Sequence, residues 1–99
     1  MPRVDGRATA FCDAQVARPQ FSPNGRGGCP GAIAVDPKRI PYGSNIRVYQ
    51  RGTNNLLYQG RACDYCGAAV RAHDYLVDVW FSSNGECNNW GVKQVSIEW

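Results

Sequence analysis

Apolar residues occur in short runs along the chain, and most runs alternate with polar residues or end at glycine, proline or asparagine. A period of two, or a short apolar run between turn residues, is typical of β-strands. The pattern predicts six strands, at residues 7–12, 32–35, 46–49, 56–63, 76–81 and 92–97. The segment 76–81 is the most apolar, and it carries a single charge, Asp78, in its middle.

The segments between these strands contain turn and helix signals. Residues 82–90 hold serine and asparagine, which favour helix starts, and Gly91 is a typical stop, so we predict one short helix there. The sequence R-G-T-N-N at 51–55 indicates a hairpin turn, and a glycine- and proline-rich loop occupies 18–31. Six short strands in so small a chain favour a closed all-β barrel, because closure removes exposed strand edges.

Length and charge restrict the function classes. A chain of 99 residues is too short to bury two separate cores, so we expect one domain at 6–99 and a disordered or cloning-derived start at 1–5. No apolar run approaches the ~20 residues of a membrane-spanning helix. The net charge is +3 and the basic residues stand singly, which favours a solvated surface and does not favour nucleic-acid binding.

Five cysteines in a chain of this length indicate an oxidising compartment and one or two disulfides. A bridge between Cys12 and Cys29 would tie the long loop to the first strand. A second bridge would lie within Cys63–Cys66, or join one of these to Cys87. The C-x-x-C spacing also occurs in redox and zinc sites. The chain lacks the βαβ context of the former and further ligand spacing for the latter, so we predict neither metal nor cofactor.

Five ordered segments of the chain resemble a known family. They are A-T-A-F-C, A-V-D-P-K-R-I-P-Y-G-S-N-I-R-V-Y, G-R-A-C-D, V-D-V-W-F-S-S and W-G-V-K-Q-V-S-I, and the resemblance that they carry runs from about residue 7 to residue 99. This order resembles the 3D domain, a family named for three aspartates. The resemblance implies a double-psi β-barrel, here six-stranded, with one short helix and disulfide staples. It also implies a relation to stationary-phase muralytic proteins and to the barrel of membrane-bound lytic transglycosylase A.

The resemblance places the three aspartates at Asp36, Asp64 and Asp78. Asp74 lies close to the third position, but the frame L-V-D-V-W-F matches Asp78. The family usually continues its second aspartate as D-T-G-G-A-I-K-G, whereas this chain reads D-Y-C-G-A-A-V-R. This departure bears on activity and substrate choice more than on the fold.

A lytic transglycosylase, as the resemblance implies, uses the sugar's own 6-hydroxyl as nucleophile and needs one carboxyl group as acid and then base. That carboxyl must begin protonated, so its pKa should be raised by poor solvation or by a like charge. We predict Asp64 as this group. Asp78 is either a second site residue or an acceptor for backbone N–H groups, and Asp36 before Pro37 also fits a simple turn.

Further residues are candidates for substrate contact. By position and chemistry we select Tyr65, Gly67, Arg71 and Trp80. Aromatic residues of a small barrel, Trp90 included, are often core residues instead. His73, the single histidine, is interpreted as a solvated loop residue.

We therefore predict an enzyme that cleaves the glycan strands of peptidoglycan. The alternative is a secreted, non-enzymatic barrel, such as a cysteine-protease inhibitor or a carbohydrate-binding module, which would contact its partner through residues 18–31. A third hypothesis is a module that targets a larger assembly to the cell wall. The first residues lack the apolar segment of a secretory signal. We expect an extracellular or cell-wall location, reached after leader removal or, as for phage lysins, without a leader.

Overall fold

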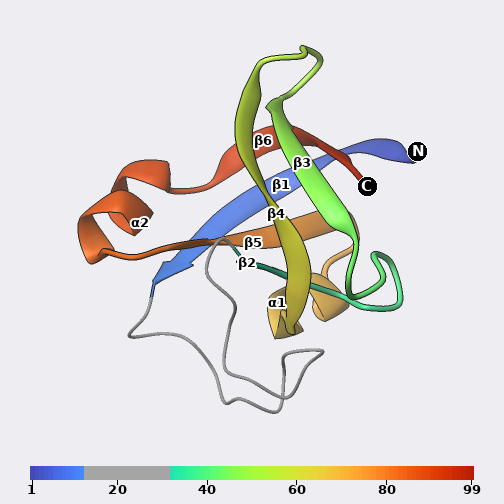
Figure 1. Cartoon of the computed structure of the whole chain (residues 1–99), viewed down its shortest axis with the longest axis horizontal. Coiled ribbons are helices and arrows are strands. Elements are labelled where there is room, and N and C mark those ends of the chain that lie inside the picture. Colours follow the sequence, from blue (N-terminus) through green and yellow to red (C-terminus); the bar gives the residue numbers. More distant parts are fainter. Residues whose placement is uncertain (13–31) are drawn as a thin grey trace.

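The computed structural model describes residues 1–12 and 32–99 (Figure 1). These residues form an all-β, six-stranded closed barrel with two short helices, as the resemblance implied apart from the second helix. The elements in chain order are β1 (Arg3–Cys12), β2 (Ala32–Val35), β3 (Asn45–Gln50), β4 (Leu56–Tyr65), α1 (Gly67–Arg71), β5 (Tyr75–Phe81), α2 (Asn84–Trp90) and β6 (Lys93–Glu98).

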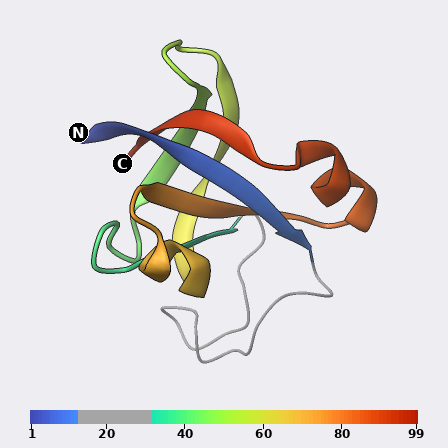
Figure 2. The same cartoon turned by 180° about the vertical axis from the view of Figure 1, so that it is seen from behind.

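The strands close in the order β1-β5-β2-β4-β3-β6. The pairs β1–β5 and β2–β4 are parallel, and the other four pairs are antiparallel. Each parallel pair joins strands that are distant in the sequence. Figure 2 shows the two chain ends side by side, where the Trp99 N–H donates to the Pro2 carbonyl at 3.1 Å.

The barrel interior holds the apolar side chains that alternate along the strands. The described core residues are all at most 2% exposed: Ala8, Ile33, Val35, Ile40, Ile46, Val48, Ala62, Val77, Val79, Val95 and Ile97. Burying each larger aliphatic side chain contributes about 1.5–3 kcal/mol, so this set is the main source of stability. The period-two pattern in the sequence is therefore the pattern of inward-facing positions.

One glycine in β1 is required by close packing. Gly6 pairs with Tyr75, and a Cβ atom at Gly6 would stand 2.4 Å from the Tyr75 carbonyl oxygen and 2.9 Å from the Ile97 Cδ1 atom. The first contact is with backbone, which cannot move aside without disturbing the β1–β5 pairing. Gly6 thus allows β1 and β5 to approach.

Three features differ from the sequence-based expectations. β1 begins at Arg3, and Arg3, Val4 and Asp5 pair with β6 in the segment where a disordered start was expected. β4 continues to Tyr65, beyond the predicted end at residue 63. α1 was not predicted, because it is a five-residue turn whose N-cap, Cys66, makes no side-chain capping bond.

The helix predicted at 82–90 is α2, which begins two residues later than predicted and ends at Trp90 as predicted. The Ser83 hydroxyl accepts from the Glu86 N–H at 3.2 Å, and Gly91 closes the helix with φ 63°. This is the N-cap and glycine-stop arrangement. Among the described residues, no helix is long and apolar enough to cross a membrane.

Candidate active site on the outer face of the barrel

One row of polar and small side chains crosses four neighbouring strands at the same level. Thr9 on β1 pairs with Asp78 on β5, and Asp78 pairs with Ala34 on β2. Ala34 pairs in turn with Asp64 on β4. The residues on either side of Asp78 in β5 are core residues, so Asp78 and the row that shares its level point away from the barrel interior. Two of the predicted aspartates therefore lie on one outer face.

Asp64 joins this row because of an irregularity in the pairing of β2 with β4. Ile33 pairs with Ala62, but the next residue, Ala34, pairs with Asp64, so Cys63 is an extra residue. Ala62 is a core residue, and strict alternation would also turn Asp64 inward. An extra residue of this kind re-aims the side chains that follow it. The irregularity thus places Asp64 on the same face as Ala34.

The row forms part of a hollow of about 240 Å³. Its lining residues are Thr9, Ala10, Phe11, Ala34, Asp64, Tyr65 and Asp78. Ala34 lies between the two aspartates and carries only a methyl group, so it leaves the centre of the hollow open. Asp64 and Asp78 are two strands apart, which corresponds to about 10 Å between their Cα atoms. This spacing leaves room for a ligand between the carboxyl groups.

The Asp64 carboxyl group is buried and lacks partners. Asp64 is only 4% exposed, and neither of its carboxylate oxygens has a hydrogen-bond partner in the described part of the chain. Burial raises the pKa of Asp64, because a poorly solvated carboxyl group favours its neutral form. The cause is burial, and not a like charge from a second aspartate. Asp64 therefore has the property that the predicted acid requires.

Asp78 has a different environment in the same hollow. The Thr9 hydroxyl donates to its Oδ1 atom at 2.9 Å. Burial raises the pKa of Asp78, and the hydrogen bond from Thr9 opposes this rise. The residue is partly buried and faces the hollow with one hydrogen bond already made. The two aspartates are thus chemically distinct.

The structure does not bring Asp36 to this hollow. Its Oδ1 atom accepts from the Lys38 N–H at 3.0 Å, and its carbonyl oxygen accepts from Arg39 and Ile40 at 2.9 Å each. Arg39 also approaches the Asp36 carboxylate at 3.7 Å and donates to the carbonyl oxygen of Ala72 at 2.7 Å. Asp36 therefore holds a turn after β2 and links it to the segment before β5.

The predicted substrate-contact residues occupy different places. Tyr65 is 42% exposed and lines the hollow. Gly67 begins α1 and lies against the side chain of Arg71, and neither of these two residues lines the hollow. Trp80 is partly buried and packs against the cluster beneath α1, beside Phe11 in the β1–β5 register. Of the four residues, Tyr65 alone lines the hollow.

Trp90 and His73 lie away from the hollow. Trp90 packs against Tyr58 and Phe81 and donates its indole N–H to the Ala8 carbonyl at 3.2 Å, so its role is structural. His73 is exposed. Within residues 1–12 and 32–99, no group of three or more histidine, cysteine, aspartate or glutamate residues is placed to hold a metal ion.

The predicted cysteine pairings were wrong. Cys12, Cys66 and Cys87 carry thiols, whereas Cys63 is disulfide-bonded. This excludes a Cys12–Cys29 bridge, a bridge within Cys63–Cys66 and a bridge from either of these to Cys87. Cys66 packs in the apolar cluster beneath α1, and Cys63 is the extra residue of the β4 irregularity, so the C-x-x-C residues have different surroundings. Cys29 and the loop 18–31 lie outside the described residues.

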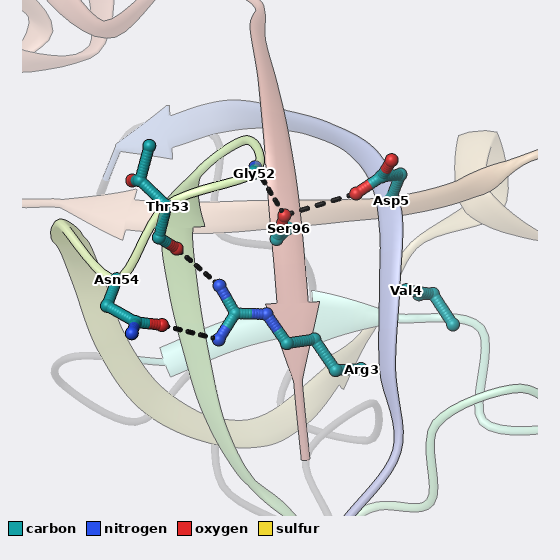
Figure 3. A pocket seen from close by; sticks show the side chains of 7 residues that line it. All are labelled: Arg3, Val4, Asp5, Gly52, Thr53, Asn54 and Ser96. Carbon is teal, nitrogen blue, oxygen red and sulfur yellow. Dashed lines mark hydrogen bonds between the residues drawn. The ribbon is translucent and has the colours of Figure 1, made fainter.

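A larger hollow of about 480 Å³ lies by the β3–β4 turn, and Figure 3 shows its polar groups bonded to one another. Arg3 donates to the Asn54 Oδ1 atom at 3.0 Å and to the Thr53 carbonyl. The Ser96 hydroxyl accepts from the Gly52 N–H at 3.0 Å and donates to Asp5 at 3.1 Å. These bonds fasten the turn to β1 and β6. Its size alone therefore does not make this hollow the better candidate site.

Comparison with known proteins agrees with the barrel and with the sequence motifs. A family profile described as "3D domain" matches residues 31–99. The chain belongs to the 3D domain family. A curated relative, "Cell wall-binding protein YocH" of Bacillus subtilis (strain 168), is 38% identical over 66 residues, which are 67% of this chain and 20% of the relative. The chain thus spans about a fifth of the relative's length. No solved structure matches the chain.

The first two residues after Asp64 both depart from the family pattern, and they have different surroundings. Cys66 packs with Ala34, Ala69 and other apolar residues in the cluster beneath α1, and its N–H donates to the Val35 carbonyl at 2.9 Å. This departure is accommodated by packing. Tyr65, in contrast, lines the hollow. The tyrosine is therefore the departure that a ligand would meet.

Sequence reasoning missed four lining residues of this 3D domain. Thr9, Ala10 and Phe11 belong to the A-T-A-F-C segment, and Ala34 lies in A-V-D-P, so each was part of a motif without a role. Their contribution follows from the register of β1, β5, β2 and β4. The sequence indicates which positions point outward, because they alternate with core positions. It does not show which strands pair, so it could not show that these residues meet.

Proposed function

We propose that this 3D domain acts on the glycan strands of peptidoglycan as a lytic transglycosylase, with Asp64 as the general acid and base. The proposal rests on the Asp64 carboxyl group, which is buried and has no hydrogen-bond partner among the described residues. Burial raises the pKa of this group, and Asp64 lines the open hollow. A carboxyl group of this kind is held protonated to a higher pH than an exposed aspartate. We infer a location outside the cell, at the cell wall, and no cofactor.

In the proposed reaction the protonated Asp64 gives its proton to the glycosidic oxygen as the bond to the anomeric carbon breaks. The 6-hydroxyl of the same sugar attacks the anomeric carbon, and the Asp64 carboxylate takes the hydroxyl proton. The carboxyl group returns to its starting state and the product is a 1,6-anhydro sugar. No water has to be activated, so one acid and base is sufficient.

The other lining residues are assigned to binding. In this proposal Asp78, whose Oδ1 atom already accepts from the Thr9 hydroxyl at 2.9 Å, accepts further hydrogen bonds from sugar hydroxyl groups. Tyr65 offers an exposed ring at the rim, and aromatic rings stack on the apolar faces of sugars. Ala34 has a small side chain, which leaves the centre of the hollow open for the ligand. The volume of the hollow, about 240 Å³, is below the usual range for ligand pockets. A volume of this size suits a short part of a glycan strand held in an open groove.

The test is a digest of purified peptidoglycan with the parent protein and with Asp64→Asn, with the products analysed by mass spectrometry. We expect anhydro-muropeptides from the parent and a loss of at least 100-fold in the variant, because general acid–base catalysis typically contributes ~10²–10⁴-fold. Asp5→Asn is the matched control, since Asp5 is an aspartate on β1 that does not line this hollow. Anhydro products at the same rate from Asp64→Asn would contradict the proposed role.

A second candidate is a wall-binding domain without catalysis. The observations in its favour are the name of the relative, a cell wall-binding protein, and the tyrosine that replaces the family's usual threonine after Asp64. Co-sedimentation with insoluble peptidoglycan tests it. Retention of the parent protein with no soluble product would support binding alone, and Tyr65→Ala should then weaken retention more than Asp64→Asn does.

A further inference from the structure

Two cysteines from distant parts of the chain meet at one end of the barrel. Cys12 is the last residue of β1 and is 3% exposed, and Cys87 lies in the middle of α2 and is partly exposed. Both carry thiols, and the two residues come within 4.2 Å of each other. The Cys12 thiol also donates to the Asn84 Oδ1 atom at 2.7 Å, which orients it toward α2.

We propose that Cys12 and Cys87 are a modification site at which thiol–disulfide exchange joins β1 to α2. A disulfide needs its sulfur atoms about 2.05 Å apart, so the pair must close by about 2 Å. Side-chain rotation and a small shift of α2 can supply this movement, because no residue of α2 is fully buried. The proposal does not rest on the proposed function.

The reaction partner is a small-molecule disulfide such as oxidised glutathione. The Cys87 thiol is the more exposed of the two, so its thiolate attacks first, forms a mixed disulfide and releases one glutathione thiolate. The Cys12 thiolate then attacks the Cys87 sulfur and expels the second glutathione. In total, two protein thiols are oxidised to one disulfide, and one glutathione disulfide is reduced to two thiols.

The crosslink would act on the barrel and on the candidate site. It would close a loop that contains most of the chain, and such a loop loses much conformational freedom in the unfolded state. It would also anchor the end of β1, the strand that carries Thr9 and Phe11 at the hollow. We therefore expect the oxidised protein to melt about 10 °C higher than the reduced form.

The test is to incubate the folded protein with oxidised glutathione, alkylate the remaining thiols, and digest with trypsin without reduction. Cleavage after arginine and lysine, but not before Pro19, separates the cysteines: Cys12 falls in peptide 8–26, Cys29 in 27–38, Cys63 and Cys66 in 62–71, and Cys87 in 72–93. We expect peptides 8–26 and 72–93 to be linked, with a mass two hydrogens below their sum.

Two variants and one change of conditions control the assignment. Cys66→Ser should keep the link, because Cys66 packs in a separate cluster beneath α1. Cys87→Ser should abolish it and leave Cys12 to be alkylated or glutathionylated. Oxidation in strong denaturant should scramble the pairing, since the folded structure brings the two thiols together. If a variant fails to fold, the peptide map of the parent protein by itself tests whether Cys12 and Cys87 are linked. Alkylation of both cysteines after oxidation, or linkage of peptide 8–26 to 27–38 or 62–71, would overturn the proposal.

Discussion

Replacing Asp64 with asparagine should stabilise the folded barrel at neutral pH while it removes the proposed activity. In the folded protein the Asp64 carboxyl group is 4% exposed and both oxygen atoms are without partners among the described residues. An ionised group in such a place loses its hydration and gains no bond in return. Asparagine has nearly the same shape and no charge, so it relieves the larger part of this cost.

The size of the effect follows from the burial. A buried neutral polar group without a partner costs about 1–3 kcal/mol, and a buried, unpaired carboxylate costs several kcal/mol. The difference is on the order of 1–3 kcal/mol in favour of the variant. For a domain of this size, each kcal/mol shifts Tm by roughly 4–8 °C, so a rise of at least ~4 °C is expected.

The pH dependence of this stabilisation has a definite sign. The pKa of Asp64 is raised on folding, so the folded state holds the proton more tightly than the unfolded state does. The stability contributed by Asp64 is therefore greatest below the ordinary aspartate pKa of about 3.9, falls as the pH rises through the folded pKa, and stays low at neutral pH. The advantage of Asp64→Asn should shrink toward low pH, where the parent carboxyl group is protonated.

Thermal unfolding of parent, Asp64→Asn and Asp5→Asn at a series of pH values between 3 and 8 measures this difference. Asp5→Asn should track the parent at every pH, because asparagine can still accept the hydrogen bond from Ser96. An Asp64→Asn variant that is less stable than the parent at neutral pH, or whose advantage is the same at pH 3, would refute the reasoning. It would mean that the carboxylate has a partner in solution or is well hydrated.

Three further substitutions test the geometry. Ala34→Leu should fill the hollow between the carboxyl groups and abolish peptidoglycan cleavage or binding. The larger side chain should lower the free energy of unfolding by about 1–3 kcal/mol. Co-sedimentation and thermal melting, measured together, distinguish a blocked site from an unfolded protein. Thr9→Val should remove the hydrogen bond that lowers the pKa of Asp78, so a carboxyl NMR titration should show a higher Asp78 pKa, and an unchanged value would remove Thr9 from the site. Gly6→Ala should destabilise the barrel by more than ~2 kcal/mol in urea unfolding, because its Cβ would stand 2.4 Å from the Tyr75 carbonyl oxygen, and near-parental stability would contradict the packing described here.

Much of the fold was predictable because the barrel depends on a local pattern. The strands 32–35, 46–49 and 76–81 carry alternating or continuous apolar residues, and their inward side chains are core residues of the structure. The end of α2 followed from Gly91, and its start lies within the serine- and asparagine-containing segment 82–90, because such signals act within a few residues of their own position. The single turn of α1 lacks such signals, and the sequence pattern did not predict it.

The cysteines show where a local pattern misleads. The spacing of Cys63 and Cys66 suggests a pair, but the distance between two thiols depends on the direction of each side chain. An extra residue in β4 and the turn into α1 give the two side chains different surroundings. The approach of Cys12 to Cys87 is created by the docking of α2 against the end of β1, which are far apart in the sequence.

The sequence by itself determined the six strands, the membership of the 3D domain family and the three aspartates as candidates, because these depend on residue type and order. The tertiary structure decided which aspartates share a site. Asp64 and Asp78 lie on strands that pair with opposite edges of β2, and one extra residue in β4 turns Asp64 to the outer face. Asp36 precedes a turn and is held by it. Residue order specifies which groups are present, whereas strand pairing and register set the distance and direction between them, and these determine whether two carboxyl groups can act on one ligand.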